Sequence, residues 1–261
     1  MKHLIATAVI MGLPALAMAQ SEQSTNRFDM PTTSIEEMKA VSPALEHYAR
    51  ERLAADLWKR TDLSPHDRSL VTVAALIATG QSGELPQYMD MALENGVKPA
   101  EISETITHLA FYTGWPNALS ALKVARHVFQ SHGIDADQLP PAQDATLPLN
   151  EEAETRRVAM VDQALGPDFK DLAAYTTDVL FKDLWLRPAL APRDRSLVTI
   201  SALVATGRVA QLTGHTNIGM NNGLTKQEIS GVITHLAFYS GWPNAMSAAP
   251  VVRKVFEERG S

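Results

Sequence analysis

Apolar residues recur along this chain with the spacing of α-helices, in segments separated by polar, Gly or Pro turns. The most apolar segment runs from Asp67 to Gly80 and reads DRSLVTVAALIATG. A charged start followed by small and branched apolar residues is typical of a buried helix. Short apolar runs of this kind also occur in buried strands, but their alanine content and terminal glycine favour helix. The pattern therefore predicts an all-α fold.

Start and stop signals predict further helices on both sides of this segment. Ser34-Ile-Glu-Glu37 is a capping box, and Ser42-Pro43 combines an N-cap residue with a proline suited to the first helical position. Asn95-Gly96 is typical of a helix C-terminus. The spacing and these signals predict helices over residues 44–60, 84–94, 99–112, 116–132 and 150–162.

The whole pattern occurs twice. The segment from Asp194 to Gly207 differs from the first at only three positions, and one constant offset also relates Gly96 to Gly223. The period is far longer than that of a solenoid repeat. We therefore expect two copies of one helical unit that pack about a pseudo-two-fold axis, as a pseudo-dimer.

The ends of these copies define the expected domains. A basic Lys2, a short apolar run and Ala17-Met18-Ala19 predict a signal peptide over residues 1–19, cleaved near Ala19. The run is shorter than the roughly 20 residues that span a bilayer. We expect a periplasmic or secreted protein that is free of the membrane after cleavage. The expected segments are a flexible leader (20–33), a first repeat (34–134), a proline-containing linker (135–149) and a second repeat (150–261).

Composition excludes several classes of function. The chain has no cysteine, so thiol peroxidase, disulfide exchange and thiolate metal chemistry are excluded. Its formal net charge is −6, and no basic cluster is interleaved with aromatic residues, so nucleic acid is not expected as a partner.

The motifs of both halves resemble the carboxymuconolactone decarboxylase family, part of the alkylhydroperoxidase-D-like superfamily. The resemblance covers nearly all of the chain after the leader. The first half carries Trp58, Arg68-Ser69-Leu70, Glu84-Leu85, Asn95-Gly96 and the segment HLAFYTGWP from His108 to Pro116. The second half carries Trp185, Arg187-Pro188-Ala189-Leu190, Arg195-Ser196-Leu197, Leu212, His215, Asn222-Gly223 and the segment HLAFYSGWP from His235 to Pro243.

This resemblance implies two tandem helical repeats with a ligand pocket where helices of the paired repeats meet. It implies a homo-oligomer, a trimer of tandem chains, and a small-molecule substrate with no cofactor. In the peroxidase branch two cysteines precede the histidine of the second helix. Their positions fall here on Gln81 and Glu84, and on Arg208 and Gln211, so that activity is excluded chemically.

The family's Glu and His, one helical turn apart, are divided between the repeats. The first repeat keeps Glu84 but has Tyr88, and the second keeps His215 but has Gln211. Either the pair is rebuilt across the interface as one composite site, or the decarboxylase chemistry is altered or lost.

Decarboxylation of a lactone acid needs a cation to hold carboxylates and an acid to protonate the remaining carbon. His215 is the leading acid–base candidate, with Glu84 as its partner; the structural alternative is a histidine that caps a neighbouring helix. Arg195 and Arg68 suit bidentate carboxylate binding. They lie in first helical turns, so a repeated salt bridge with Asp194 or Asp67 is the structural alternative.

Four further residues are candidates for the walls of the pocket. They are Tyr88, His108, His235 and Trp242. The two histidines lie among apolar residues, which favours core or interface roles over chemistry. No carboxylate or third histidine stands at ligand spacing, so a metal site is not expected.

Two functions remain open from the sequence. The first is an exported, cofactor-independent carboxy-lyase that acts on a small carboxylated lactone resembling γ-carboxymuconolactone. The second is a non-catalytic ligand-binding or assembly protein on the same fold, to which the divided Glu/His pair points.

Overall fold

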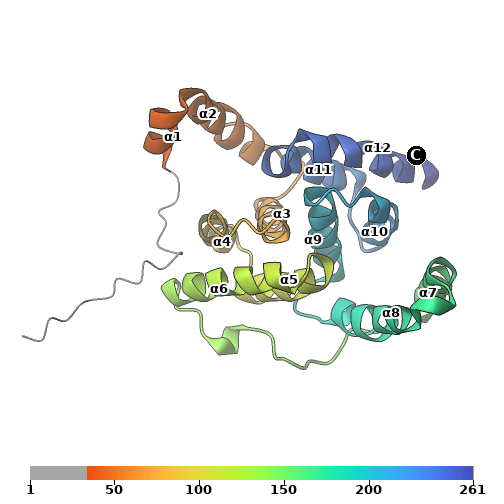
Figure 1. Cartoon of the computed structure of the whole chain (residues 1–261). Helices are drawn as coiled ribbons and strands as arrows, with labels where there is room; N and C mark the ends of the chain where they lie inside the picture. The colour runs from red at the N-terminus through yellow and green to blue at the C-terminus, as the bar shows by residue number, and fades with distance from the viewer. Residues whose placement is uncertain (1–33, 261) are drawn as a thin grey trace, which may run out of the picture. The chain divides into compact units, whose positions relative to one another are not determined.

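The computed structural model describes residues 34–260, and within them the chain forms helices and no strand (Figure 1). The predicted signal peptide and leader lie outside the described residues. The first repeat contains α1 (Ile35–Val41), α2 (Pro43–Tyr48), α3 (Pro65–Ala78), α4 (Leu85–Glu94), α5 (Pro99–Tyr112) and α6 (Trp115–Ser131). The second contains α7 (Glu151–Leu165), α8 (Lys170–Tyr175), α9 (Pro192–Ala205), α10 (Val209–Asn221), α11 (Lys226–Ser240) and α12 (Trp242–Glu258). The all-α prediction is confirmed.

Local sequence signals set most helix ends. Ser34 and Glu37 form the expected capping box at the start of α1. Before α3, the Ser64 hydroxyl accepts a hydrogen bond from the backbone N–H of Asp67, and Pro65 occupies the first helical position. Gly96 ends α4 with a φ of 88°, a conformation that glycine adopts without steric cost.

The prediction of one helix over residues 44–60 is wrong. After α2 the chain continues as a π-helical segment, η1 (Ala49–Ala54), and then a 3₁₀ turn, η2 (Leu57–Lys59). The second repeat does the same with η5 (Thr176–Phe181) and η6 (Leu184–Leu186). Apolar spacing near 3.6 residues cannot separate an α-helix from a brief π-helical segment. Each 3₁₀ turn carries one tryptophan, Trp58 in the first repeat and Trp185 in the second.

The two repeats pack as a pseudo-dimer through their most apolar helices. Helices α3 and α9 contact each other, α5 of the first repeat packs against α9, and α11 of the second packs against α3. Every residue of α3 from Asp67 onward is buried, as is the equivalent part of α9 from Asp194. The repeats therefore share one packed core, to which helices of both repeats contribute.

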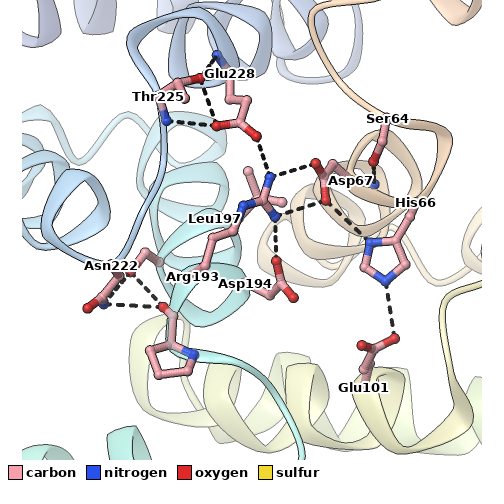
Figure 2. A network of polar contacts seen from close by, with 12 residues as sticks. Ser64, His66, Asp67, Glu101, Arg193, Asp194, Leu197, Asn222, Thr225 and Glu228 are labelled. Atoms are coloured by element: carbon pink, nitrogen blue, oxygen red, sulfur yellow. Dashed lines mark hydrogen bonds and ion pairs between the residues drawn. The ribbon is translucent and has the colours of Figure 1, made fainter.

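A charged network lies at the N-terminal ends of α3 and α9 (Figure 2). Arg193 bridges the repeats: its guanidinium donates to Asp67 (2.7 Å), Asp194 (2.6 Å) and Glu228 (2.6 Å). The His66 ring contacts Asp67 (3.3 Å) and Glu101 (3.2 Å). The expected salt bridges from Arg68 and Arg195 to Asp67 and Asp194 are thus replaced, because Arg193 already holds both carboxylates.

This network predicts a loss of stability at alkaline pH. Hydrogen bonds from Asp67 and Glu101 raise the pKa of His66 from 6.5 to about 10, although burial opposes them. Because the folded pKa lies above the unfolded one, the stabilisation is complete below pH 6.5 and is lost as pH rises toward 10. The free energy of unfolding should fall by at most about 1.4 kcal/mol per pH unit over this range.

Urea unfolding between pH 6 and 10 measures this slope. His66→Gln should reduce it, whereas His132→Gln, at an exposed histidine beside Asp90, should leave it unchanged. An equally steep decline in His66→Gln would contradict the assignment.

The linker docks onto the second repeat. It contains a 3₁₀ turn, η3 (Ala136–Gln138), and otherwise has no regular secondary structure. The Arg187 guanidinium donates to the carbonyls of Pro141 and Ala142, and the Leu147 N–H donates to the carbonyl of Leu186. Across residues 34–260, no helix has both the length and the apolar character of a membrane span.

Candidate functional site

Two clusters of aromatic and histidine side chains lie where the repeats meet. We call them the His215 cluster (His108, Tyr112, Trp185 and His215) and the Tyr88 cluster (Trp58, Tyr88, His235 and Tyr239). Each combines an α5 or α11 pair from one repeat with a tryptophan and an α10 or α4 residue from the other. Both clusters are therefore composite.

The rings of the His215 cluster contact one another closely. The His215 ring lies parallel to Trp185 (centroids 6.0 Å apart) and edge-on to Tyr112 (5.3 Å). The Trp185 indole N–H donates to the Tyr112 hydroxyl at 2.8 Å. Trp185 and Tyr112 thus hold each other in place beside His215.

His215 itself has no hydrogen bond to any other described residue, and its Nδ1 atom is buried without a partner. Burial lowers its pKa from 6.5 to about 4, so the imidazole is neutral at pH 7. A buried ring nitrogen without a partner is costly in a purely structural residue. It is instead available to a ligand, in keeping with the acid–base role expected of His215.

His108 is held in one tautomer. Its Nε2 lies 2.7 Å from Thr199 Oγ1, which itself donates to the carbonyl of Arg195. Its Nδ1 faces the Arg195 guanidinium at 3.4 Å and can only accept there. Burial and the Arg195 charge lower the pKa of His108 well below 6.5. His108 is therefore a neutral interface histidine, the alternative that its apolar sequence context favoured.

The Tyr88 cluster also contains a histidine nitrogen, His235 Nδ1, that is buried without a partner, but its residue equivalent to His215 is hydrogen-bonded. Trp58 donates to the Tyr239 hydroxyl (2.8 Å), which donates to the Tyr88 hydroxyl (3.2 Å). His235 Nε2 lies 2.8 Å from Thr72 Oγ1, and burial lowers the pKa of His235 to about 3. The Tyr88 hydroxyl is bonded where the equivalent His215 is not, so the repeats differ at this position in chemistry as well as in sequence.

Arg195 forms a buried ion pair with Glu104 and not with Asp194, the partner that the sequence suggested. It is 0% exposed, and its guanidinium donates to Glu104 of α5 at 2.6 Å and to the carbonyl of Arg187 at 2.9 Å. Arg187 also holds Glu104, at 2.7 Å. Two guanidinium groups thus share one carboxylate and leave one net positive charge. The Arg195 Nε atom remains buried without a partner.

In the first repeat the equivalent arginine, Arg68, also lies near a carboxylate, but this carboxylate is that of Asp62. Asp62 accepts from Arg60 at 2.7 Å and lies 3.8 Å from Arg68. Arg68 also donates to the carbonyls of Trp58, Arg60 and Leu63. Gly231 stands where the other repeat has Glu104, and a Cβ there would lie 3.0 Å from the Asp62 carboxyl carbon. The guanidinium of Arg68 therefore already has partners within the protein.

The different position of the carboxylate in the two repeats can be seen in the sequence. At the constant offset between the halves, Glu104 corresponds in sequence to Gly231, and Asp62 corresponds to Ala189. Each repeat carries a carboxylate at one of these two positions and an uncharged residue at the other. Only the fold shows that the two positions lie beside equivalent arginines.

Two expected site residues lie elsewhere. Glu84 is exposed at the start of α4, where its charge acts on Tyr88, whereas His215 belongs to the other cluster. Of the two alternatives that the sequence left open, the structure therefore does not support a composite site formed by Glu84 and His215. Trp242 is 56% exposed and packs edge-on against Phe238, so it lines neither cluster. Within residues 34–260, no group of three or more His, Asp or Glu side chains has a geometry suited to a metal ion.

The fold and these clusters define a tandem all-α protein with composite histidine–aromatic sites at its repeat interface. The model of the Carboxymuconolactone decarboxylase family matches residues 43–127 and 170–254, and the chain belongs to this family. The resemblance inferred from the sequence motifs is confirmed.

Two decarboxylases are among its relatives. The chain is 30% identical over 128 residues to 4-carboxymuconolactone decarboxylase from Acinetobacter baylyi, which covers 49% of this chain and 91% of the relative. It is 32% identical over 82 residues to nitrosuccinic acid decarboxylase from Metarhizium robertsii, which covers 31% of this chain and 57% of the relative. Both relatives are named for the removal of CO2 from a small acid.

Proposed function

We propose that this protein is a cofactor-independent carboxy-lyase that decarboxylates a small carboxylated lactone, or a related acid, at the His215 cluster. The observation that carries the proposal is the unpartnered, buried ring nitrogen of His215 beside Tyr112 and Trp185. The equivalent Tyr88 is hydrogen-bonded within its own cluster. One chain would therefore hold one active site.

The charges around the cluster suit an anionic substrate. The Arg187–Glu104–Arg195 group carries one net positive charge, and Arg195 reaches His108 within the cluster. This charge supports the binding of a carboxylate, and the unpaired Nε of Arg195 offers a donor. Arg68 and Glu84, which lie with the Tyr88 cluster, have no part in this mechanism.

The reaction assigns His215 one proton transfer. The C–C bond to a carboxylate breaks, CO2 leaves, and the electron pair enters the unsaturated lactone. A ring carbon then takes a proton from His215, which solvent replaces. A neutral His215 cannot donate that proton, but a bound carboxylate favours the imidazolium and raises its pKa. Substrate binding therefore favours the protonated form of His215, which can act as the acid.

The direct test is turnover of 4-carboxymuconolactone (γ-carboxymuconolactone) by the purified mature protein. We expect release of one CO2 per lactone consumed. Binding of the lactone without CO2 release would overturn the carboxy-lyase and favour a ligand-binding protein on the same fold.

Export and assembly are further parts of the proposal. The apolar segment before Ala17-Met18-Ala19 supports export to the periplasm or medium. Exposed aromatic side chains at equivalent places in both repeats, Trp115 and Trp242 with their neighbours Phe111 and Phe238, support a homo-oligomer of tandem chains. The family resemblance suggests that this oligomer is a trimer. N-terminal sequencing of exported protein and sedimentation velocity test these two points.

A further inference from the structure

A cavity of about 260 Å³ lies beside the His215 cluster but outside it. The end of the linker, α7, the η5–η6 segment and the ends of α9 and α10 line it. Trp185 belongs to both places, whereas His215, Tyr112 and His108 do not line the cavity. The cavity is therefore a separate space that shares one wall with the proposed active site.

Aromatic rings form one side of this cavity. Phe181 stacks on Trp185 with the ring planes 10° apart and the centroids at 5.7 Å. The Arg157 guanidinium lies 4.4 Å from the centroid of the Phe181 ring. Leu149, Leu186 and Ile218 contribute aliphatic wall, and the Glu154 carboxyl group lines the cavity together with Asn150 and Asn222. Such walls suit the flat, apolar body of a small ligand.

One polar group in the cavity has an unfilled hydrogen-bond position. The Arg157 side chain is only 11% exposed. Its Nε and Nη2 atoms donate to Glu154 at 2.8 and 2.7 Å, and Nη2 also donates to Thr177. Its Nη1 atom is buried and has no partner among the described residues. A guanidinium N–H in this position pairs best with a carboxylate oxygen.

Among the described residues, the first repeat lacks the aromatic stack of this arrangement. Ala54 stands where the second repeat has Phe181, so no ring from that position stacks on Trp58. The stack that forms one side of the cavity thus belongs to the second repeat, next to the cluster that holds His215.

We propose that this cavity is a second small-molecule site, which binds a flat, largely apolar monocarboxylate. The ring body lies against Phe181 and Trp185, and a carboxylate oxygen accepts from Arg157 Nη1. This site is distinct from the His215 cluster, and its ligand need not be the substrate of the proposed reaction.

Titration calorimetry with 2-naphthoate, and with 2-naphthamide as its uncharged counterpart, tests the proposal. The carboxylate should bind more tightly than the amide. Arg157→Met should weaken naphthoate binding by about tenfold or more, the loss expected for one charge-assisted hydrogen bond. Arg156→Met is the matched control: Arg156 is the exposed neighbour that pairs with Glu152 on the surface, and its loss should not change the affinity.

Two more variants are controls, one for misfolding and one for binding at another site. Ala153→Phe places a ring in the cavity from α7, leaves the Arg157–Glu154 pair intact, and should abolish binding. His215→Ala should bind naphthoate as the parent does. Equal affinity in Arg157→Met and the parent, binding that persists in Ala153→Phe, or amide bound as tightly as carboxylate would each overturn the proposal. Loss of binding in His215→Ala would place the ligand in the catalytic cluster instead.

Discussion

His215→Ala is expected to lower kcat for 4-carboxymuconolactone by about 10²-fold or more, the usual contribution of a positioned acid–base group. The Nδ1 atom of His215 has no hydrogen-bond partner in the cluster, and Tyr112 and Trp185 remain hydrogen-bonded to each other without His215. The fold should therefore survive the substitution. CO2 release and a thermal melt, measured on the same preparation, separate loss of chemistry from loss of structure.

His132→Ala is the matched control, because His132 is exposed and pairs only with Asp90 on the surface. It should keep the activity of the parent. Turnover by His215→Ala equal to that of the parent would remove His215 from the mechanism, even if the protein is a decarboxylase.

Proton uptake gives a second readout of the same residue. The pKa of His215 is about 4 in the empty site, and a bound carboxylate raises it. At pH values between this pKa and the raised pKa of the complex, substrate binding should therefore take up a proton, seen by calorimetry in buffers of different ionisation enthalpy. His215→Gln should bind without that uptake.

Glu104→Gln is expected to destabilise the fold by about 3–5 kcal/mol, the cost of leaving a buried charge without its partner. Arg195 is 0% exposed, and Glu104 is its only carboxylate partner among the described residues. Urea unfolding measures the change in the free energy of unfolding. Glu152→Gln is the control: Glu152 is 83% exposed beside Arg156, and its loss should change stability by less than about 1 kcal/mol.

The first repeat suggests a compensating variant. There the carboxylate comes from Asp62, opposite Ala189 of the second repeat, and the helix position is Gly231. Glu104→Gly combined with Ala189→Asp copies this layout, so it should be more stable than Glu104→Gly alone. If the two are equally unstable, the Asp62 and Glu104 positions are not interchangeable sources of the carboxylate.

The helical class, the tandem repeat and most helix ends could be predicted from the order of the amino acids. These features depend on local signals: the Ser34 capping box, the glycine at the end of α4 and the apolar run of α3 act within a few residues along the chain. The duplication was visible as a constant offset, and the motifs identified the family. The same motifs made His215 the leading acid–base candidate, because it occupies the family's histidine position, where the first repeat has Tyr88.

The assembly of the sites, in contrast, depends on how the two repeats pack. Helix α5 packs against α9 and α11 against α3, so each cluster takes its residues from both repeats. This exchange separates Glu84 from His215, brings Glu104 to Arg195, and gives Arg193 the carboxylates expected for Arg68 and Arg195. Spacing along a helix predicts which residues share a face, but it carries no information on which distant helix covers that face. The partners of the buried charges therefore became known only from the packing of one repeat against the other.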